Sequence, residues 1–135
     1  MELIDSSAWI EYLRATGSPA AIEVRRLLHE QLSDVVTTEP IVMELLAGAR
    51  DDRALTQLET LTNGLRLLRV NGGADYHDAA HVYRAARAGG ATVRTLVDCL
   101  IAVVAARTGA VLVHRDRDFD ALARALPALR VRSLR

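Results

Sequence analysis

The sequence of 135 residues contains no lysine, so every one of its seventeen basic residues is an arginine. This absence argues against several phosphate-handling classes. A P-loop requires Gly-Lys-Ser/Thr, and receiver domains and haloacid-dehalogenase-like phosphatases position a lysine beside their aspartate. The single cysteine, Cys99, excludes a disulfide framework, and the apolar run that follows it indicates a small buried residue.

Long hydrophobic runs are also missing. Every uncharged stretch is well short of the roughly 18 apolar residues that a membrane-spanning helix needs. The chain begins with the acidic pair Met1-Glu2, where a signal peptide would be basic. We therefore expect a cytoplasmic protein with no membrane partner. The length and the 50% hydrophobic content fit one globular domain over residues 1–135.

The net charge is zero, but the charges are unevenly distributed. Residues 1–60 hold five arginines and eleven acids, whereas residues 61–135 hold twelve arginines and six acids. Guanidinium groups suit bidentate phosphate contacts, so the later half can follow a nucleic-acid backbone. A general preference for arginine explains the same counts equally well, and the charge alone does not decide between the two interpretations.

Short apolar strands alternate with helices along the chain. We expect strands at 3–4, 34–37, 65–70 and 110–113 and a possible edge strand from 131. Helices are expected from Ser6 or Ser7 to Leu13, from Ser18-Pro19 to about 28, and at about 40–49, 53–62, 74–88, 95–108 and 116–125. This alternation predicts an α/β fold, with a mostly parallel sheet of four to five short strands and helices on both faces.

Four acidic residues are expected at the carboxyl edge of this sheet, where α/β proteins place their functional groups. Asp5 ends the first strand, Asp116 follows the strand at 110–113, and Glu44 lies in the second turn after the second strand. Asp98 begins a helix that must run antiparallel to the strand after it, so this helix start lies at the same edge. Residues that are far apart in the sequence therefore meet in one cleft.

Two of these acids stand in otherwise apolar segments: Glu44 is the only charge in 40–49, and Asp98 is the only charge in 96–106. Carboxylates that are buried close together repel one another and raise each other's pKa, and a divalent cation relieves both effects. Oxygen-only ligands favour Mg²⁺ or Mn²⁺ over zinc. Each acid also has a simpler interpretation: Asp5 and Asp116 as helix caps, Asp98 as a partner of the helix dipole, and Glu44 as a side chain that reaches solvent.

Four motifs in this order resemble those of PIN-domain nucleases, and among them the VapC-type toxins of prokaryotic toxin–antitoxin pairs. The resemblance covers nearly the whole chain. The motifs are Leu3-Ile4-Asp5-Ser6-Ser7-Ala8-Trp9-Ile10, Glu44-Leu45-Leu46-Ala47-Gly48-Ala49, Asp98-Cys99-Leu100-Ile101-Ala102 and His114-Arg115-Asp116-Arg117-Asp118-Phe119. The sequence departs from the pattern at Val97, where relatives often carry a polar residue.

The resemblance implies a compact α/β sandwich, often homodimeric, that hydrolyses RNA with Mg²⁺ or Mn²⁺ and leaves a 5′-phosphate and a 3′-hydroxyl. Asp5, Asp98 and Asp116 would face the metal, with Glu44 as a ligand or water-orienting group. Asp118 is a further metal candidate. Because it stands one step further from the strand than Asp116, we expect its side chain to turn towards solvent. Ser7 would support the first aspartate, and Arg94 and Arg115 would meet phosphate. The resemblance also implies a VapB-like antitoxin that lies beside the active site.

Three alternatives remain at this point. His77 and His81 are four residues apart and would form half of a zinc site, unless they belong to a solvated helix surface with Asp75, Asp78 and Arg84. Asp5 would be the nucleophile of an aspartyl phosphotransferase, although the missing lysine and the serine at position 7 count against it. The third alternative keeps the PIN fold but changes its use, either as a non-toxin nuclease in RNA processing or as a catalytically silent RNA-binding scaffold.

Overall fold

The computed structural model describes all 135 residues and contains one sheet of five strands in the order β3-β2-β1-β4-β5, every neighbouring pair parallel. The elements in chain order are β1 (Glu2–Ile4), α1 (Ser6–Leu13), α2 (Pro19–Glu30), the 3₁₀ turn η1 (Leu32–Asp34), β2 (Val35–Thr37), α3 (Glu39–Ala47), α4 (Asp52–Asn63), β3 (Arg66–Leu67), α5 (Gly72–Ala88), α6 (Leu96–Thr108), β4 (Val111–His114), α7 (Arg117–Ala125) and β5 (Arg130–Ser133).

The predicted alternation and α/β class are confirmed, and the possible edge strand near residue 131 is present as β5. The largest difference lies in the segment predicted as strand 65–70, where only Arg66 and Leu67 pair with a neighbour. This strand is at the edge of the sheet beside β2, which is itself only three residues long, so few backbone partners are within reach.

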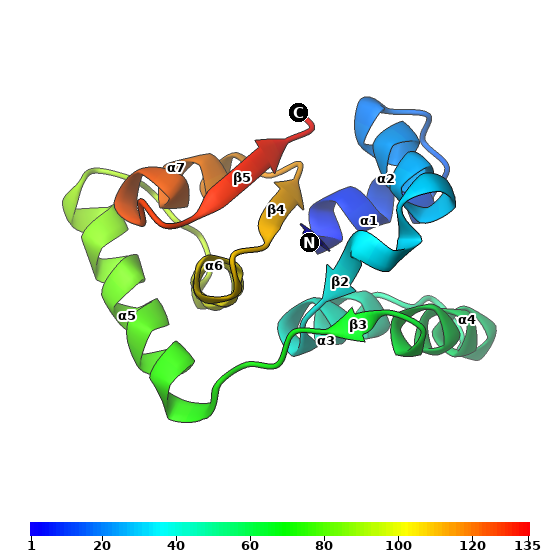
Figure 1. The fold of residues 1–135 in the computed structure, drawn as a ribbon, viewed down its shortest axis with the longest axis horizontal. Helices are drawn as coiled ribbons and strands as arrows, with labels where there is room; N and C mark the ends of the chain where they lie inside the picture. The colour runs from blue at the N-terminus through cyan, green and yellow to red at the C-terminus, as the bar shows by residue number, and fades with distance from the viewer.

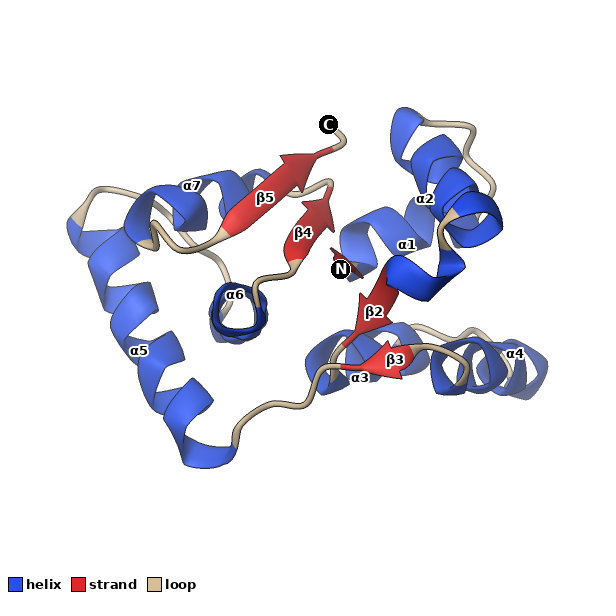
Figure 2. Cartoon of the chain, viewed as in Figure 1, coloured by secondary structure: helices blue, strands red, loops and turns tan.

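Helices cover the sheet on both faces. Figure 1 shows α1 and α2 on one side of the strands, with α6 on the other side and α5 outside it. Residues 98–105 of α6 are all buried, which explains why this segment is apolar on every side rather than along one stripe. Figure 2 shows the loop that leaves the end of α5 and passes α7 before it enters α6.

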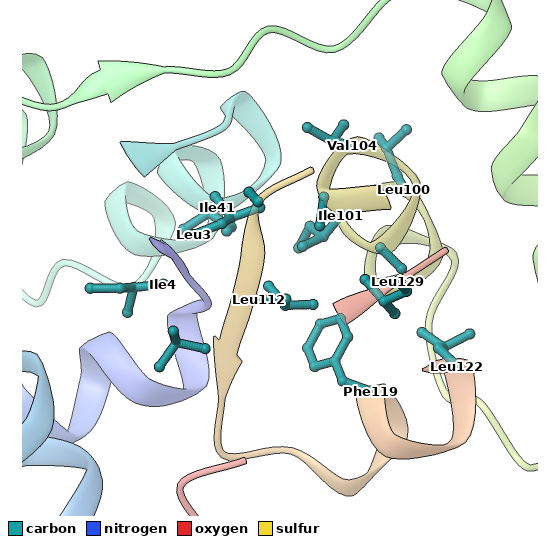
Figure 3. Packing of buried hydrophobic residues seen from close by; sticks show 14 of the residues in the cluster. Leu3, Ile4, Ile41, Leu100, Ile101, Val104, Leu112, Phe119, Leu122 and Leu129 are labelled. Carbon is teal, nitrogen blue, oxygen red and sulfur yellow. The ribbon is translucent and has the colours of Figure 1, made fainter. Parts of the chain in front are cut away.

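The core lies between α6, α7 and the central strands. Ile101, Leu112 and Phe119 are fully buried and point into the same space (Figure 3). They belong to one hydrophobic cluster of 29 buried residues that extends through both faces of the sheet. Cys99 belongs to this cluster and burial raises the pKa of its thiol to about 11, so its predicted role as a small buried residue is confirmed.

One prediction for α5 is wrong. Asp75 is not part of a solvated surface: it is buried, and it accepts hydrogen bonds from Nε and Nη2 of Arg107 at 2.9 and 2.8 Å. The partner stands 32 residues later in the chain, on α6, and satisfies the charge that burial would otherwise leave uncompensated. Arg107 also donates to the carbonyl oxygen of Arg69, which fixes the segment before α5 against α6.

None of the helices combines the length and the hydropathy that a membrane crossing requires.

Candidate active site

Asp5 occupies the junction of β1 and α1, at the carboxyl edge of the sheet. Its N–H donates to the carbonyl oxygen of Val113, and its Oδ2 caps α1 by accepting the N–H of Ser7 at 3.0 Å. The other oxygen, Oδ1, is buried and has no hydrogen-bond partner. Burial raises the pKa of this carboxyl, although the bonds from Ser7 act in the opposite direction. Asp5 Oδ1 therefore remains free to accept a ligand such as a cation.

Asp98 lies in the first turn of α6, where Thr95 caps the helix by accepting the Asp98 N–H at 3.2 Å. One carboxylate oxygen each from Asp98, Asp116 and Asp118 fall within 4.8 Å of one another. Burial, together with the charges of Asp5, Asp116 and Glu44, raises the pKa of Asp98 to about 7. Folding therefore brings together the acids that the sequence spreads over more than a hundred positions.

Asp116 and Asp118 open α7, directly after β4. Asp116 is the N-cap, and its Oδ1 accepts the N–H of Asp118 at 2.9 Å. The expectation that Asp118 turns towards solvent is wrong, because its side chain is only 4% exposed whereas that of Asp116 is 21% exposed. Asp118 points inwards because Arg94, 24 residues earlier, donates to it from its backbone N–H and from Nε.

Glu44, on α3, is half-buried and stands outside the group of three closely spaced carboxylates. Ser6 Oγ, in the first turn of α1, donates to its Oε1 at 3.2 Å. Burial and the nearby charge of Asp5 both raise the pKa of Glu44. Glu44 therefore lies close to Asp5, as a fifth acidic residue beside Asp5, Asp98, Asp116 and Asp118.

The predicted supporting residues connect the segments that bear the acidic cluster. Ser7 Oγ accepts the backbone N–H of Arg115 at 2.9 Å, which connects the start of α1 to the turn between β4 and α7. The Arg115 guanidinium forms an ion pair with Glu11 on α1. Arg94 forms ion pairs with both Asp116 and Asp118. Both arginines lie near the cluster, and each already has an acidic partner.

The structure adds one residue that the sequence did not single out, His114. This side chain at the end of β4 is fully buried, and its Nδ1 accepts the N–H of Asp116 at 3.1 Å. Its Nε2 lies 3.3 Å from Asp120, which also pairs with Arg135. Burial lowers the pKa of His114, so the neutral ring with a proton on Nε2 fits both contacts. The sequence signal for this residue is its position, because a histidine directly follows a run of apolar residues that predicts a buried strand.

The alternative zinc site is not supported. His77 and His81 lie on the exposed face of α5 with their ring centroids 4.6 Å apart and their planes tilted by 56°, and no third histidine, cysteine or carboxylate completes a site with them. The acidic cluster, by contrast, fits a divalent cation such as Mg²⁺ or Mn²⁺. It offers only oxygen ligands, it contains the unpartnered Asp5 Oδ1, and the neighbouring carboxylates raise the pKa of Asp98.

A comparison with known families decides the classification, because the PIN domain family model matches residues 3–125. The chain belongs to the PIN-domain family. Over 124 residues it is 58% identical to ribonuclease VapC11 of Mycobacterium tuberculosis, with 92% of each chain covered. These two findings confirm the resemblance to PIN nucleases of the VapC type.

Solved structures share the fold at lower sequence identity. VapBC2 from Rickettsia felis, bound to a DNA fragment from its promoter, gives a TM-score of 0.74 at 12% identity, over 98% of this chain and 97% of that chain. VapC20 of Mycobacterium tuberculosis, a toxin that cleaves the sarcin–ricin loop, gives 0.68 at 20% identity, over 90% and 94%. Both likenesses concern the fold, and they confirm the predicted PIN-like sheet with helices on both faces.

Proposed function

We propose that this protein is a Mg²⁺- or Mn²⁺-dependent endoribonuclease that acts in the cytoplasm as the toxin of a VapBC-type toxin–antitoxin pair. The observation that carries the proposal is the convergence of Asp98, Asp116 and Asp118 beside the unpartnered oxygen of Asp5. The identity of 58% with a VapC ribonuclease supports the same chemistry. An aspartyl phosphotransferase does not fit this family, and the chain has no lysine to serve one.

Asp5, Asp98 and Asp116, with Asp118, would hold the ion, and Glu44 would bind it or orient water. A bound Mg²⁺ or Mn²⁺ supplies an acidified water and neutralises charge on the phosphoryl oxygens. The chain positions its own groups for this role: Ser7 and Ser6 orient Asp5 and Glu44, and His114 fixes the backbone of Asp116. Arg94 and Arg115 are the cations nearest to the cluster for a substrate phosphate.

The test is cleavage of a mixed RNA pool by the purified protein, with MgCl₂, with MnCl₂ and with EDTA. We expect metal-dependent cleavage that leaves a 5′-phosphate and a 3′-hydroxyl. Asp5→Asn, Asp98→Asn, Asp116→Asn and Asp118→Asn should each remove it, whereas Asp78→Asn, on the exposed surface of α5, should not. A folded protein that binds RNA without cutting it under any of these conditions would favour the silent scaffold instead.

The antitoxin belongs to the same proposal. A groove of about 580 Å³ between α1 and α2 is lined mainly by apolar side chains, among them Tyr12, Leu13, Ala21 and Ile22, with Arg25 at its edge. Ile22 is 63% exposed although it is strongly apolar. Such a groove suits the apolar face of a short antitoxin segment, and burial of its surface contributes about 25 cal/mol per Å².

We also propose that the toxin forms a homodimer, as members of this family often do. Exposed apolar side chains on α3, α5 and α6 support an interface outside the groove: Met43, Tyr76 and Leu96. Light scattering coupled to gel filtration tests this. A single species with twice the mass of 14.7 kDa is the expected result, and a monomer at micromolar concentration would contradict it.

A further inference from the structure

Arg94 places a cation inside the acidic cluster. The residue lies in the loop between α5 and α6, and its backbone N–H and Nε both donate to Asp118 Oδ2, at 3.2 and 2.9 Å. Its Nη2 donates to both oxygens of Asp116, at 2.9 and 2.8 Å. The guanidinium therefore bridges two of the three carboxylates that approach one another most closely. Asp98 and Asp5, in contrast, receive no hydrogen bond from any basic side chain.

The contact with Asp116 can be broken without unfolding the loop. Val93, the residue before Arg94, is 1% exposed and anchors the loop in the core, and Thr95 after it caps α6. The Arg94 side chain itself is 60% exposed. The backbone bond to Asp118 depends on these anchors, whereas the bonds from Nη2 to Asp116 depend only on the side-chain rotamer. Movement of the guanidinium tip alone would remove the arginine from both Asp116 oxygens and leave only the capping bond from the Asp118 N–H to Oδ1.

We propose that Arg94 is a built-in counter-cation of the acidic cluster: it neutralises Asp116 and Asp118 in the metal-free protein and competes with the divalent ion for Asp116. This inference rests on the proposed nuclease function. Once its tip leaves Asp116, Arg94 remains tied to Asp118 through its backbone and stands at the cleft, where it is available to a phosphate of the RNA. One residue thus opposes metal binding and assists substrate binding.

Because of this dual role, Arg94→Ala should strengthen metal binding and weaken catalysis. Loss of the competing cation should tighten Mn²⁺ binding about five-fold, since a partly exposed ion pair contributes about 1 kcal/mol. Electron paramagnetic resonance of free Mn²⁺, without RNA, measures this directly. At saturating Mn²⁺, kcat/KM for RNA should nevertheless fall about ten-fold or more, because a phosphate contact is lost. Arg94→Lys, which keeps a charge but not the fork, should lie between the two proteins in both measurements.

The matched control is Arg87→Ala. Arg87 stands on α5 near the same loop, where its side chain contacts Tyr83 through a hydrogen bond and its ring and forms no ion pair. This variant should leave Mn²⁺ affinity unchanged, which separates competition within the cluster from a general loss of positive charge.

In EDTA, Arg94→Ala should melt at a lower temperature than the wild type. Mn²⁺ should raise the melting temperature of Arg94→Ala by a larger amount than that of the wild type.

The outcomes separate this inference from the function on which it rests. If the wild type binds Mn²⁺ and cleaves RNA but Arg94→Ala binds Mn²⁺ equally well or more weakly, the counter-cation role is wrong and the nuclease stands. Weaker Mn²⁺ binding together with lower activity would make Arg94 a support of the cluster rather than a competitor. If the wild type neither binds Mn²⁺ nor cleaves RNA, the proposed function fails and the inference with it.

Discussion

Asp98 combines the strongest like-charge environment of the cluster with a position in a buried helix. Its pKa of about 7 in the folded protein lies above the ordinary value of 3.8, so the folded state holds the proton more tightly than the unfolded state. The contribution of this group to apo stability therefore declines as the pH rises from about 4 to about 7. The difference corresponds to a free energy on the order of 4 kcal/mol.

We expect Asp98→Asn to remove most of this decline. Urea denaturation in EDTA at pH 5 and pH 8 should give a smaller difference for the variant than for the wild type, and the variant should be the more stable protein at pH 8. Excess Mg²⁺ should stabilise the wild type more at pH 8 than at pH 5, since binding requires the carboxylates without their protons. An identical pH dependence in both proteins would contradict the assigned environment of Asp98.

His114 supports the acidic cluster by accepting the backbone N–H of Asp116, and it is not itself a metal ligand. We expect His114→Leu to weaken Mn²⁺ binding, because the Asp116 N–H loses its acceptor and the turn is no longer fixed. An unsatisfied buried N–H costs about 1–3 kcal/mol. His114→Asn offers a carbonyl oxygen near the position of Nδ1 and should recover part of the affinity, although both variants lose packing against Phe119. Equal Mn²⁺ affinity in all three proteins would show that His114 only fills the core.

Ser7 connects α1 to the turn after β4, next to the acidic cluster. Ser7→Ala should destabilise the protein by about 1 kcal/mol and also lower Mn²⁺ affinity, since Arg115 N–H loses its acceptor next to Asp116. Ser18→Ala is the matched control: Ser18 caps α2 by accepting the Ala21 N–H, so its loss costs a similar amount but lies outside the cleft. Thermal unfolding and Mn²⁺ titration of both variants separate stability from assembly of the site. A Ser18 variant that also loses affinity would refute the distinction.

Local signals in the sequence account for most of these elements. Ser18-Pro19 predicted the start of α2 because a cap and a proline at the first turn act within a few residues. The apolar run after Asp98 predicted α6, and the carboxyl-edge rule predicted where the acids meet. The errors at Asp75 and Asp118 have a common cause: each acid is buried because an arginine 32 or 24 positions away pairs with it. Periodicity contains no information about such distant partners.

The fold presents an acidic cluster at the carboxyl edge of the sheet and, separately, an apolar groove between α1 and α2. The two are connected by α1, which is capped by Asp5 and ends at the groove residue Leu13. An unregulated ribonuclease damages its own cell, so the proposed toxin requires an inhibitor that reaches the cleft. A segment seated in the groove and extended along α1 would do so, and a guanidinium at its end would satisfy several acidic oxygens at once.

A substitution at Ile22 tests this arrangement, because the residue lies in the groove and outside the acidic cluster. Ile22→Glu should cleave RNA like the wild type, but the product of the neighbouring open reading frame should inhibit it at least ten-fold less well. Burial of an isoleucine contributes about 1.5–3 kcal/mol, and a buried glutamate adds a desolvation penalty. Leu32→Glu, at a similarly exposed apolar site beyond α2, should remain fully inhibited. Equal inhibition of all three proteins would place the antitoxin elsewhere. If the wild type expressed alone leaves growth intact while the purified protein still cleaves RNA with Mg²⁺, the toxin assignment fails and the nuclease assignment stands.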